Sequence, residues 1–117
     1  MKIQNLPKKI YLCDLIELKR KNYIIKWIDE WRDELIVFLD KEEQIKIFSS
    51  ICAHFGGPVF FDKKGDKLIC KWHNWMYSSE NGKCLNQHIQ SSLRSYKFEI
   101  KEKDEKNNEK IYAIINE

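Results

Sequence analysis

The 117-residue chain is predicted to be a small all-β protein, an antiparallel sandwich or barrel. Two patterns predict this fold class. Short apolar runs are separated by polar turns at close intervals, and in residues 96–101 apolar side chains alternate strictly with lysine and glutamate. A chain of this length forms one domain, residues 1–117, that buries about two thirds of its unfolded surface.

Polar turns at 40–43, 62–66 and 79–82 define the predicted hairpins, and the charged segment 103–110 separates the last two strands. We therefore expect strands over residues 34–39, 44–48, 59–61, 68–69, 75–78, 96–101 and 111–115.

Residues 22–38 do not fit this pattern. Apolar residues from Ile24 to Phe38 recur at helical spacing, which on its own predicts an amphipathic helix. The same stretch carries an acidic cluster, which is most simply a solvated face, or else a surface that repels wrong partners or faces a basic one. The cluster consists of Asp29, Glu30, Asp33 and Glu34.

Two segments each combine one cysteine with one histidine: Cys52-x-His54 and Cys70-x-x-His73. In extended backbone, side chains two residues apart project to the same side, so the first pair can face one site. The second pair requires a turn between its members. Two thiolates with two imidazoles are the ligand set of a mixed-ligand 2Fe-2S cluster.

Two other site chemistries use the same residue types. Structural zinc sites also combine two cysteines with two histidines, but they usually open with cysteines two to four residues apart, unlike Cys52-x-His54. A cysteine–histidine nucleophilic pair would leave the second pair without a role.

The motifs resemble the Rieske iron–sulfur signature, and Gly56 after the first pair and Trp75 two residues beyond the second agree with it. The resemblance extends from about residue 35 to 112. It implies a Rieske-like β-sandwich or barrel with two cluster-binding hairpin loops, within about residues 49–86. In residues 22–38 it favours strands at both ends, with a turn or short helix at 29–33.

The resemblance also implies the cofactor and its ligands. Each chain would hold one Rieske 2Fe-2S cluster, with Cys52 and Cys70 on the inner iron and His54 and His73 on the outer iron. Because two imidazoles replace two thiolates, an added electron meets less negative charge, and the potential of such clusters lies above that of plant-type ferredoxins.

Departures from the family pattern define a subtype. Gly57 and Trp72 occupy the positions of the two disulfide cysteines of respiratory members, so that bridge cannot form. The serine and tyrosine that donate to the cluster in high-potential members lack a counterpart at Trp75, which implies a low-potential centre. Asn74 stands where glycine is usual, and asparagine is the best substitute where φ is positive.

The residues after the second pair decide between carrier and catalyst. An oxygenase needs a mononuclear iron with two histidines and a carboxylate, but only His88, expected to be a loop residue, follows His73. We therefore expect no enzyme but a ferredoxin-like one-electron carrier between a flavin-dependent reductase and a terminal oxygenase or other acceptor. Alternatives are a non-catalytic Rieske subunit or domain of a multicomponent hydroxylase, and a redox or iron sensor.

Composition limits the remaining partners and the location. The net charge of +3 is too modest to indicate nucleic acid. The amino terminus lacks the apolar run of a signal peptide and no stretch reaches membrane-spanning length, so we expect a cytoplasmic protein without membrane contact. Cys13 and Cys84 are expected to be reduced thiols packed in or near the core.

Overall fold

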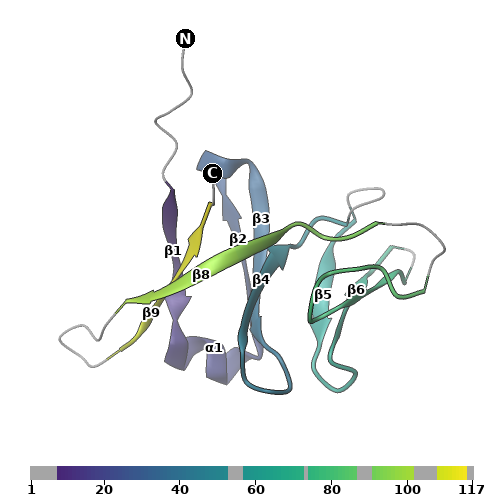
Figure 1. The fold of residues 1–117 in the computed structure, drawn as a ribbon, viewed down its shortest axis with the longest axis horizontal. Coiled ribbons are helices and arrows are strands. Elements are labelled where there is room, and N and C mark those ends of the chain that lie inside the picture. Colours follow the sequence, from purple (N-terminus) through teal and green to yellow (C-terminus); the bar gives the residue numbers. More distant parts are fainter. Residues whose placement is uncertain (1–7, 53–56, 73, 87–90, 102–107, 116–117) are drawn as a thin grey trace, which may run out of the picture.

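The computed structural model describes residues 8–52, 57–72, 74–86, 91–101 and 108–115. Within these ranges the chain forms short strands with one α-helix and one 3-10 turn (Figure 1). The elements are β1 (Lys9–Asp14), α1 (Leu15–Lys21), β2 (Tyr23–Ile28), η1 (Asp29–Trp31), β3 (Asp33–Leu39), β4 (Ile45–Ser49), β5 (Val59–Asp62), β6 (Lys67–Cys70), β7 (Met76–Ser78), β8 (Ser95–Lys101) and β9 (Lys110–Ile114).

The strands form two antiparallel sheets, which confirms the predicted fold class. The larger sheet has the order β1-β9-β8-β4-β3-β2, and the smaller sheet has the order β5-β6-β7. Both edge strands of the larger sheet contribute to one apolar core, through Leu12 of β1 and Ile28 of β2. The sheet is therefore rolled into a nearly closed barrel, and the Lys26 ammonium reaches across the seam to the Tyr11 carbonyl oxygen at 3.0 Å.

Strand β3 is buried on both faces, and this burial joins the two sheets. Leu35 and Val37 pack into the barrel core, whereas Ile36 and Phe38 pack against the smaller sheet. Phe38 stacks on Phe61 of β5 with ring centroids 4.2 Å apart. The smaller sheet, whose strand β6 ends at Cys70, is thus fixed to the barrel by a second apolar core, which also contains Cys52.

Residues 22–38 form β2, η1 and β3, as the resemblance implies, so the amphipathic helix predicted by pattern alone is wrong. Arg32 adopts a left-handed conformation with φ of 52° and ends η1. A strand buried on both faces lacks the apolar–polar alternation of a surface strand, and its continuous apolar run also satisfies helical spacing. The apparent helix period comes from this two-sided burial.

The other predicted strands are confirmed, with ends displaced by no more than one residue. Strand β1 and helix α1 are additions that the sequence patterns did not indicate. The side chain of Leu18 anchors α1, because it is fully buried in the barrel core. In the part of the chain that the structure describes, no helix has both the length and the apolar character needed to cross a membrane.

Candidate metal centre

The first cysteine, Cys52, follows β4 at the start of a loop whose two ends are joined by backbone hydrogen bonds. Ile51 forms an isolated antiparallel bridge with Pro58, and the amide of Cys52 donates to the carbonyl oxygen of Gly57 at 2.8 Å. The Cys52 side chain is buried, with 3% of its surface exposed. The thiol therefore faces the interior at the base of a loop whose two ends are held together.

The second cysteine ends β6 and begins a loop closed in the same way. The amide of Cys70 donates to the carbonyl oxygen of Trp75 at 2.8 Å, five residues on, as Cys52 does to Gly57. The amide of Asn74 donates to the carbonyl oxygen of Cys70 at 2.9 Å, which forms the turn expected after this cysteine. The thiol of Cys70 is fully buried.

The two loops lie against each other. Val59 pairs with Cys70 in the β5–β6 ladder, and the amide of Lys71 donates to the carbonyl oxygen of Pro58 at 2.9 Å. A Cβ atom on Gly57 would lie 2.9 Å from Sγ of Cys70 and 2.9 Å from the ring of Trp72. Position 57 thus has room only for glycine, because the sulfur and the indole occupy the space of a side chain.

Tyr77 adds a polar contact to the first cysteine, and it was not identified from the sequence. Its hydroxyl lies 3.1 Å from Sγ of Cys52, and its side chain is fully buried in β7. The expectation from the sequence considered position 75 alone, where the chain has a tryptophan. The structure places a tyrosine hydroxyl beside the Cys52 sulfur two residues later, on β7, where Tyr77 pairs with Leu68 of β6.

Two asparagines shape the second loop. Asn74 has a φ of 57°, so the expected positive φ at this position is confirmed. Asn86 braces the same loop from the segment after β7: its Nδ2 donates to the Asn74 carbonyl oxygen at 3.0 Å, and its Oδ1 accepts from the Met76 amide at 2.9 Å. No local sequence signal points to Asn86, because its role depends on the return of the chain to β7.

The acidic cluster is solvated only in part: Asp29 and Glu30 are exposed as expected, whereas Asp33 and Glu34 form hydrogen bonds behind the first loop. Asp33 is buried, and its carboxylate accepts from the hydroxyls of Ser49 and Tyr96 at 2.7 and 2.6 Å. The pKa of Tyr96 is raised, first by burial and then by the bond to Asp33. Ser50, one residue further along, donates to the Glu34 carboxylate at 2.7 Å. These bonds fix the start of the first loop on β3.

His54, His73 and His88 lie outside the described residues. Among the residues that are described, no three or more side chains of histidine, cysteine, aspartate or glutamate gather at one point. The two remaining cysteines match expectation: Cys13 is buried in the barrel core, and Cys84 packs partly buried beside Tyr77, with which it forms an isolated bridge.

Comparison with known proteins identifies the family. The model of the Rieske 2Fe-2S domain matches residues 8–97, so the chain belongs to that family, and the match begins well before the expected residue 35. The oxygenase component of a 3-ketosteroid-9-alpha-monooxygenase from Rhodococcus rhodochrous is 35% identical over 54 residues. That alignment covers 45% of this chain but only 14% of the oxygenase component.

Two solved structures share the fold over nearly their full length. The plasma membrane Rieske protein of Synechocystis PCC 6803 has a TM-score of 0.70 at 20% identity, over 87% of this chain and 97% of that one. The ferredoxin of carbazole 1,9a-dioxygenase from Nocardioides aromaticivorans IC177 has a TM-score of 0.69 at 17% identity, over 94% and 100%.

A Rieske domain binds a 2Fe-2S cluster, and the described residues fit one. Cys52 and Cys70 are both free of disulfides and buried in the same apolar core, on two loops that are in contact. The absence of a side chain at Gly57 leaves the second sulfur unobstructed. A sulfur that already has a hydroxyl at 3.1 Å is prepared to carry negative charge, as an iron-bound thiolate does.

Proposed function

We propose that the chain is a one-electron carrier, and that Cys52, His54, Cys70 and His73 hold its cluster. The observation that carries this proposal is the pairing of two closed loops in contact, each of which begins with a buried cysteine thiol. The two histidines follow these cysteines at the family's spacing. The cluster, when bound, accepts and releases one electron.

The chain's own residues would exclude water from the inner side of the cluster and stabilise the negative charge of its thiolate ligands. Phe48 and Leu68 close the apolar core around both cysteines, which excludes water from the sulfurs. With Cys52 as a thiolate, the Tyr77 hydroxyl donates to it, which favours the more electron-rich state. The Trp72 indole covers Gly57 while 60% of its surface stays exposed, so it offers apolar contact area to a redox partner.

The carrier role and its partners are supported by the full-length likeness to a ferredoxin. In that role the chain passes electrons from a flavin-dependent reductase to a terminal oxygenase or similar acceptor, in the cytoplasm. Electron-transfer partners associate weakly over small interfaces, which suits a single exposed tryptophan beside two short loops.

A second candidate role is that of a non-catalytic Rieske domain in a multicomponent hydroxylase. The likeness to an oxygenase component favours it, although the chain spans about one seventh of that relative. In this role the chain would stay bound to a protein that holds the mononuclear iron.

The first experiment tests the cluster. After anaerobic purification we expect equal amounts of iron and acid-labile sulfide, and a dithionite titration that consumes one electron for every two irons, with a mixed-valence signal in electron paramagnetic resonance. Alanine at each of the four proposed ligands should abolish the signal, whereas Cys84→Ala should keep it. Zinc without sulfide would refute the proposed cofactor.

The second experiment separates the two roles. The reduced protein is mixed with a ferredoxin-dependent oxygenase, and electron transfer is followed over repeated additions. A carrier is oxidised and re-reduced many times and elutes separately from the acceptor on gel filtration. Co-elution with a mononuclear-iron protein at a fixed ratio, without exchange, would support the hydroxylase domain instead.

A further inference from the structure

The outer surface of β1, β9 and β8 carries more lysines than carboxylates. On β9, Ile111 and Ala113 are fully buried in the barrel core, so Lys110 and Tyr112 lie on the opposite face. The strand register continues this face onto both neighbours. We call this surface the lysine face and include Lys26, which reaches across to it from β2. Its residues are Lys9, Tyr11, Asp14, Lys26, Lys97, Glu99, Lys101, Lys110, Tyr112 and Ile114.

Two tyrosines form the centre of the lysine face. Tyr11 and Tyr112 are paired in register, and their rings meet edge to face with centroids 5.8 Å apart. Each ring has two ammonium groups near it, at distances from 5.1 to 5.6 Å from the ring centroid. Lys26 and Lys110 lie over Tyr11, and Lys9 and Lys101 lie over Tyr112. The rings thereby hold four flexible lysines in place, which lowers the entropy that a partner must overcome.

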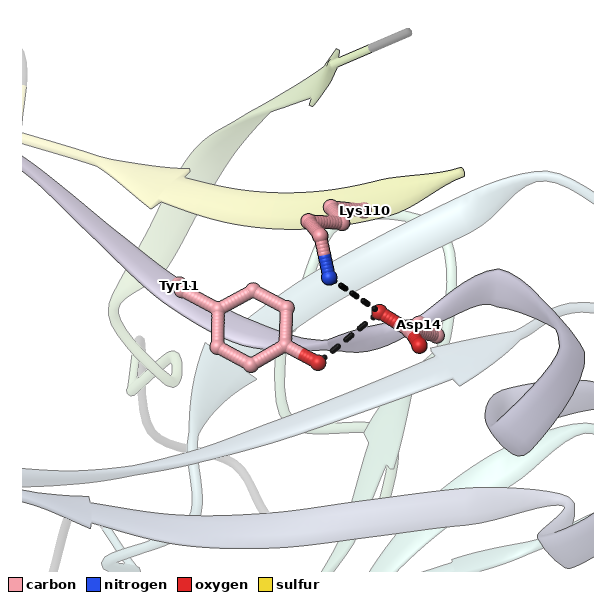
Figure 2. A network of polar contacts seen from close by, with 3 residues as sticks. All are labelled: Tyr11, Asp14 and Lys110. Atoms are coloured by element: carbon pink, nitrogen blue, oxygen red, sulfur yellow. Dashed lines mark hydrogen bonds and ion pairs between the residues drawn. The ribbon is translucent and has the colours of Figure 1, made fainter. Parts of the chain in front are cut away.

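Both carboxylates of the face are already engaged. Figure 2 shows the Asp14 carboxylate between the Tyr11 hydroxyl at 2.8 Å and the Lys110 ammonium at 3.4 Å. Glu99 accepts from Lys9 at 3.0 Å. Burial and the bond to Asp14 raise the pKa of Tyr11, so its hydroxyl stays protonated. These contacts fix the positions of the charges and leave an excess of lysine.

The charge of the lysine face equals that of the entire chain. Five lysines and two carboxylates give it +3, which is also the formal net charge of all 117 residues, so the remaining charges balance. A surface with this excess attracts opposite charge, since exposed charges act over about 10 Å at ordinary ionic strength.

We propose that the lysine face is a docking surface for an acidic surface of a partner protein. All five cations are lysines and none is an arginine, which is the side chain preferred for bidentate phosphate recognition. The face also combines two hydrogen-bonded carboxylates with two tyrosines, and aromatic residues such as tyrosine are enriched in protein interfaces. Both features favour a protein with matched charges of both signs over a nucleic acid or a lipid surface.

The lysine face lies away from the cysteine loops, so docking there is compatible with electron transfer at the loops. The cysteine loops arise between β4 and β7, and Figure 1 shows β1 and β9 at the opposite side of the molecule from β5 and β6. A partner on the lysine face therefore leaves the cysteine loops accessible to another protein. The face anchors the chain, and the loops remain free to exchange electrons. Binding at the lysine face does not require the cluster, so this proposal can be tested independently of the proposed electron-carrier function.

The test uses the cluster-loaded protein and three probes: a glutamate-rich peptide, a single-stranded DNA of matched length, and vesicles containing phosphatidylserine. Binding is measured by fluorescence anisotropy or co-sedimentation at low salt and at about 0.15 M salt. We expect the peptide to bind, with affinity that falls as salt rises. A combined Lys9→Gln, Lys97→Gln and Lys101→Gln variant should bind it at least about tenfold more weakly.

A matched control removes the same charge elsewhere. Lys19→Gln, Lys63→Gln and Lys64→Gln together alter exposed lysines outside the face and should change peptide affinity by less than about twofold. If the triple face variant unfolds, Lys97→Glu with Lys101→Glu on exposed β8 positions makes the same test. The proposal is overturned if the control loses as much affinity, if no peptide binds at low salt, or if DNA or vesicles bind more tightly with the same lysine dependence.

Discussion

The hydroxyl of Tyr77 lies 3.1 Å from Sγ of Cys52, although 25 residues separate the two in the chain. Tyr77→Phe keeps the buried ring and removes this hydrogen bond. Donation to a thiolate stabilises the reduced state more than the oxidised one, so we expect the reduction potential to fall. A loss of about 1 kcal/mol corresponds to about 40 mV for one electron.

Protein-film voltammetry or a redox titration of the loaded protein measures this shift. Tyr23→Phe is the matched control, because Tyr23 packs against the same apolar core, whereas Tyr77 is the tyrosine whose hydroxyl lies beside the Cys52 sulfur. Its potential should equal that of the parent protein. An intact cluster with an unshifted potential in Tyr77→Phe would show that the hydroxyl does not tune the site.

Glycine at position 57 is required by a contact rather than by backbone conformation. Its φ is not in the left-handed region, but a Cβ would approach both the Cys70 sulfur and the Trp72 ring at 2.9 Å. We expect Gly57→Ala to destabilise the protein by about 1–3 kcal/mol, as overpacking does, and to speed loss of the cluster to a chelator.

Gly65→Ala is the comparison for this substitution. There a Cβ would meet the ends of the Lys67 and Asp62 side chains, which can move away. Thermal unfolding and the half-life of the visible absorption in chelator should therefore be unchanged. Equal effects of the two substitutions would mean that the space at position 57 is not specific to the cysteine loops.

Asn74 has a φ of 57°, a left-handed conformation that disfavours a Cβ atom. Glycine adopts it freely because it has no Cβ, and asparagine and aspartate tolerate it better than other residues. Asn74→Ala should lower the free energy of unfolding by about 1 kcal/mol, whereas Asn74→Gly should be nearly neutral. Urea unfolding of the three proteins measures the difference. Equal stability of the alanine and glycine variants would contradict a left-handed turn at this position.

Burial raises the pKa of the Cys13 thiol to about 12 from an ordinary 9.0. The folded state then holds this proton more tightly than the unfolded state, so this thiol's contribution to stability is complete below pH 9 and is lost as the pH rises toward 12. Cys13→Ala should lower stability at neutral pH, because it leaves a small cavity, and should flatten the decline of stability above pH 9.

Alkylation tests the same burial independently. At pH 8 iodoacetamide should modify the partly exposed Cys84 and leave Cys13 unmodified until the protein is unfolded, with mass spectrometry of the fragments as the readout. Rapid modification of Cys13 in the folded protein would show that the barrel core opens readily.

Local patterns predicted most of the fold. Polar turns between short apolar runs located the strands to within one residue, because a turn's chemistry and a strand's alternation are properties of neighbouring residues. The strand pair in residues 22–38 was more difficult to predict. Because β3 is buried on both faces, its residues are apolar on both sides and do not alternate with polar ones. The family resemblance, not the periodicity, indicated the correct division there.

The sequence by itself supplied the ligand set that we propose for the cluster: two cysteines and two histidines at a spacing that only a few kinds of site use. The tertiary structure decided which other residues act on that site. Tyr77 reaches Cys52, Asn86 reaches the second loop, and Asp33 is buried under Ser49, because antiparallel pairing brings together strands that are distant in the chain. The register of these pairings depends on packing of the whole barrel. The same register collects the lysines of β1, β8 and β9 on one face, although in the sequence they are scattered among acidic neighbours.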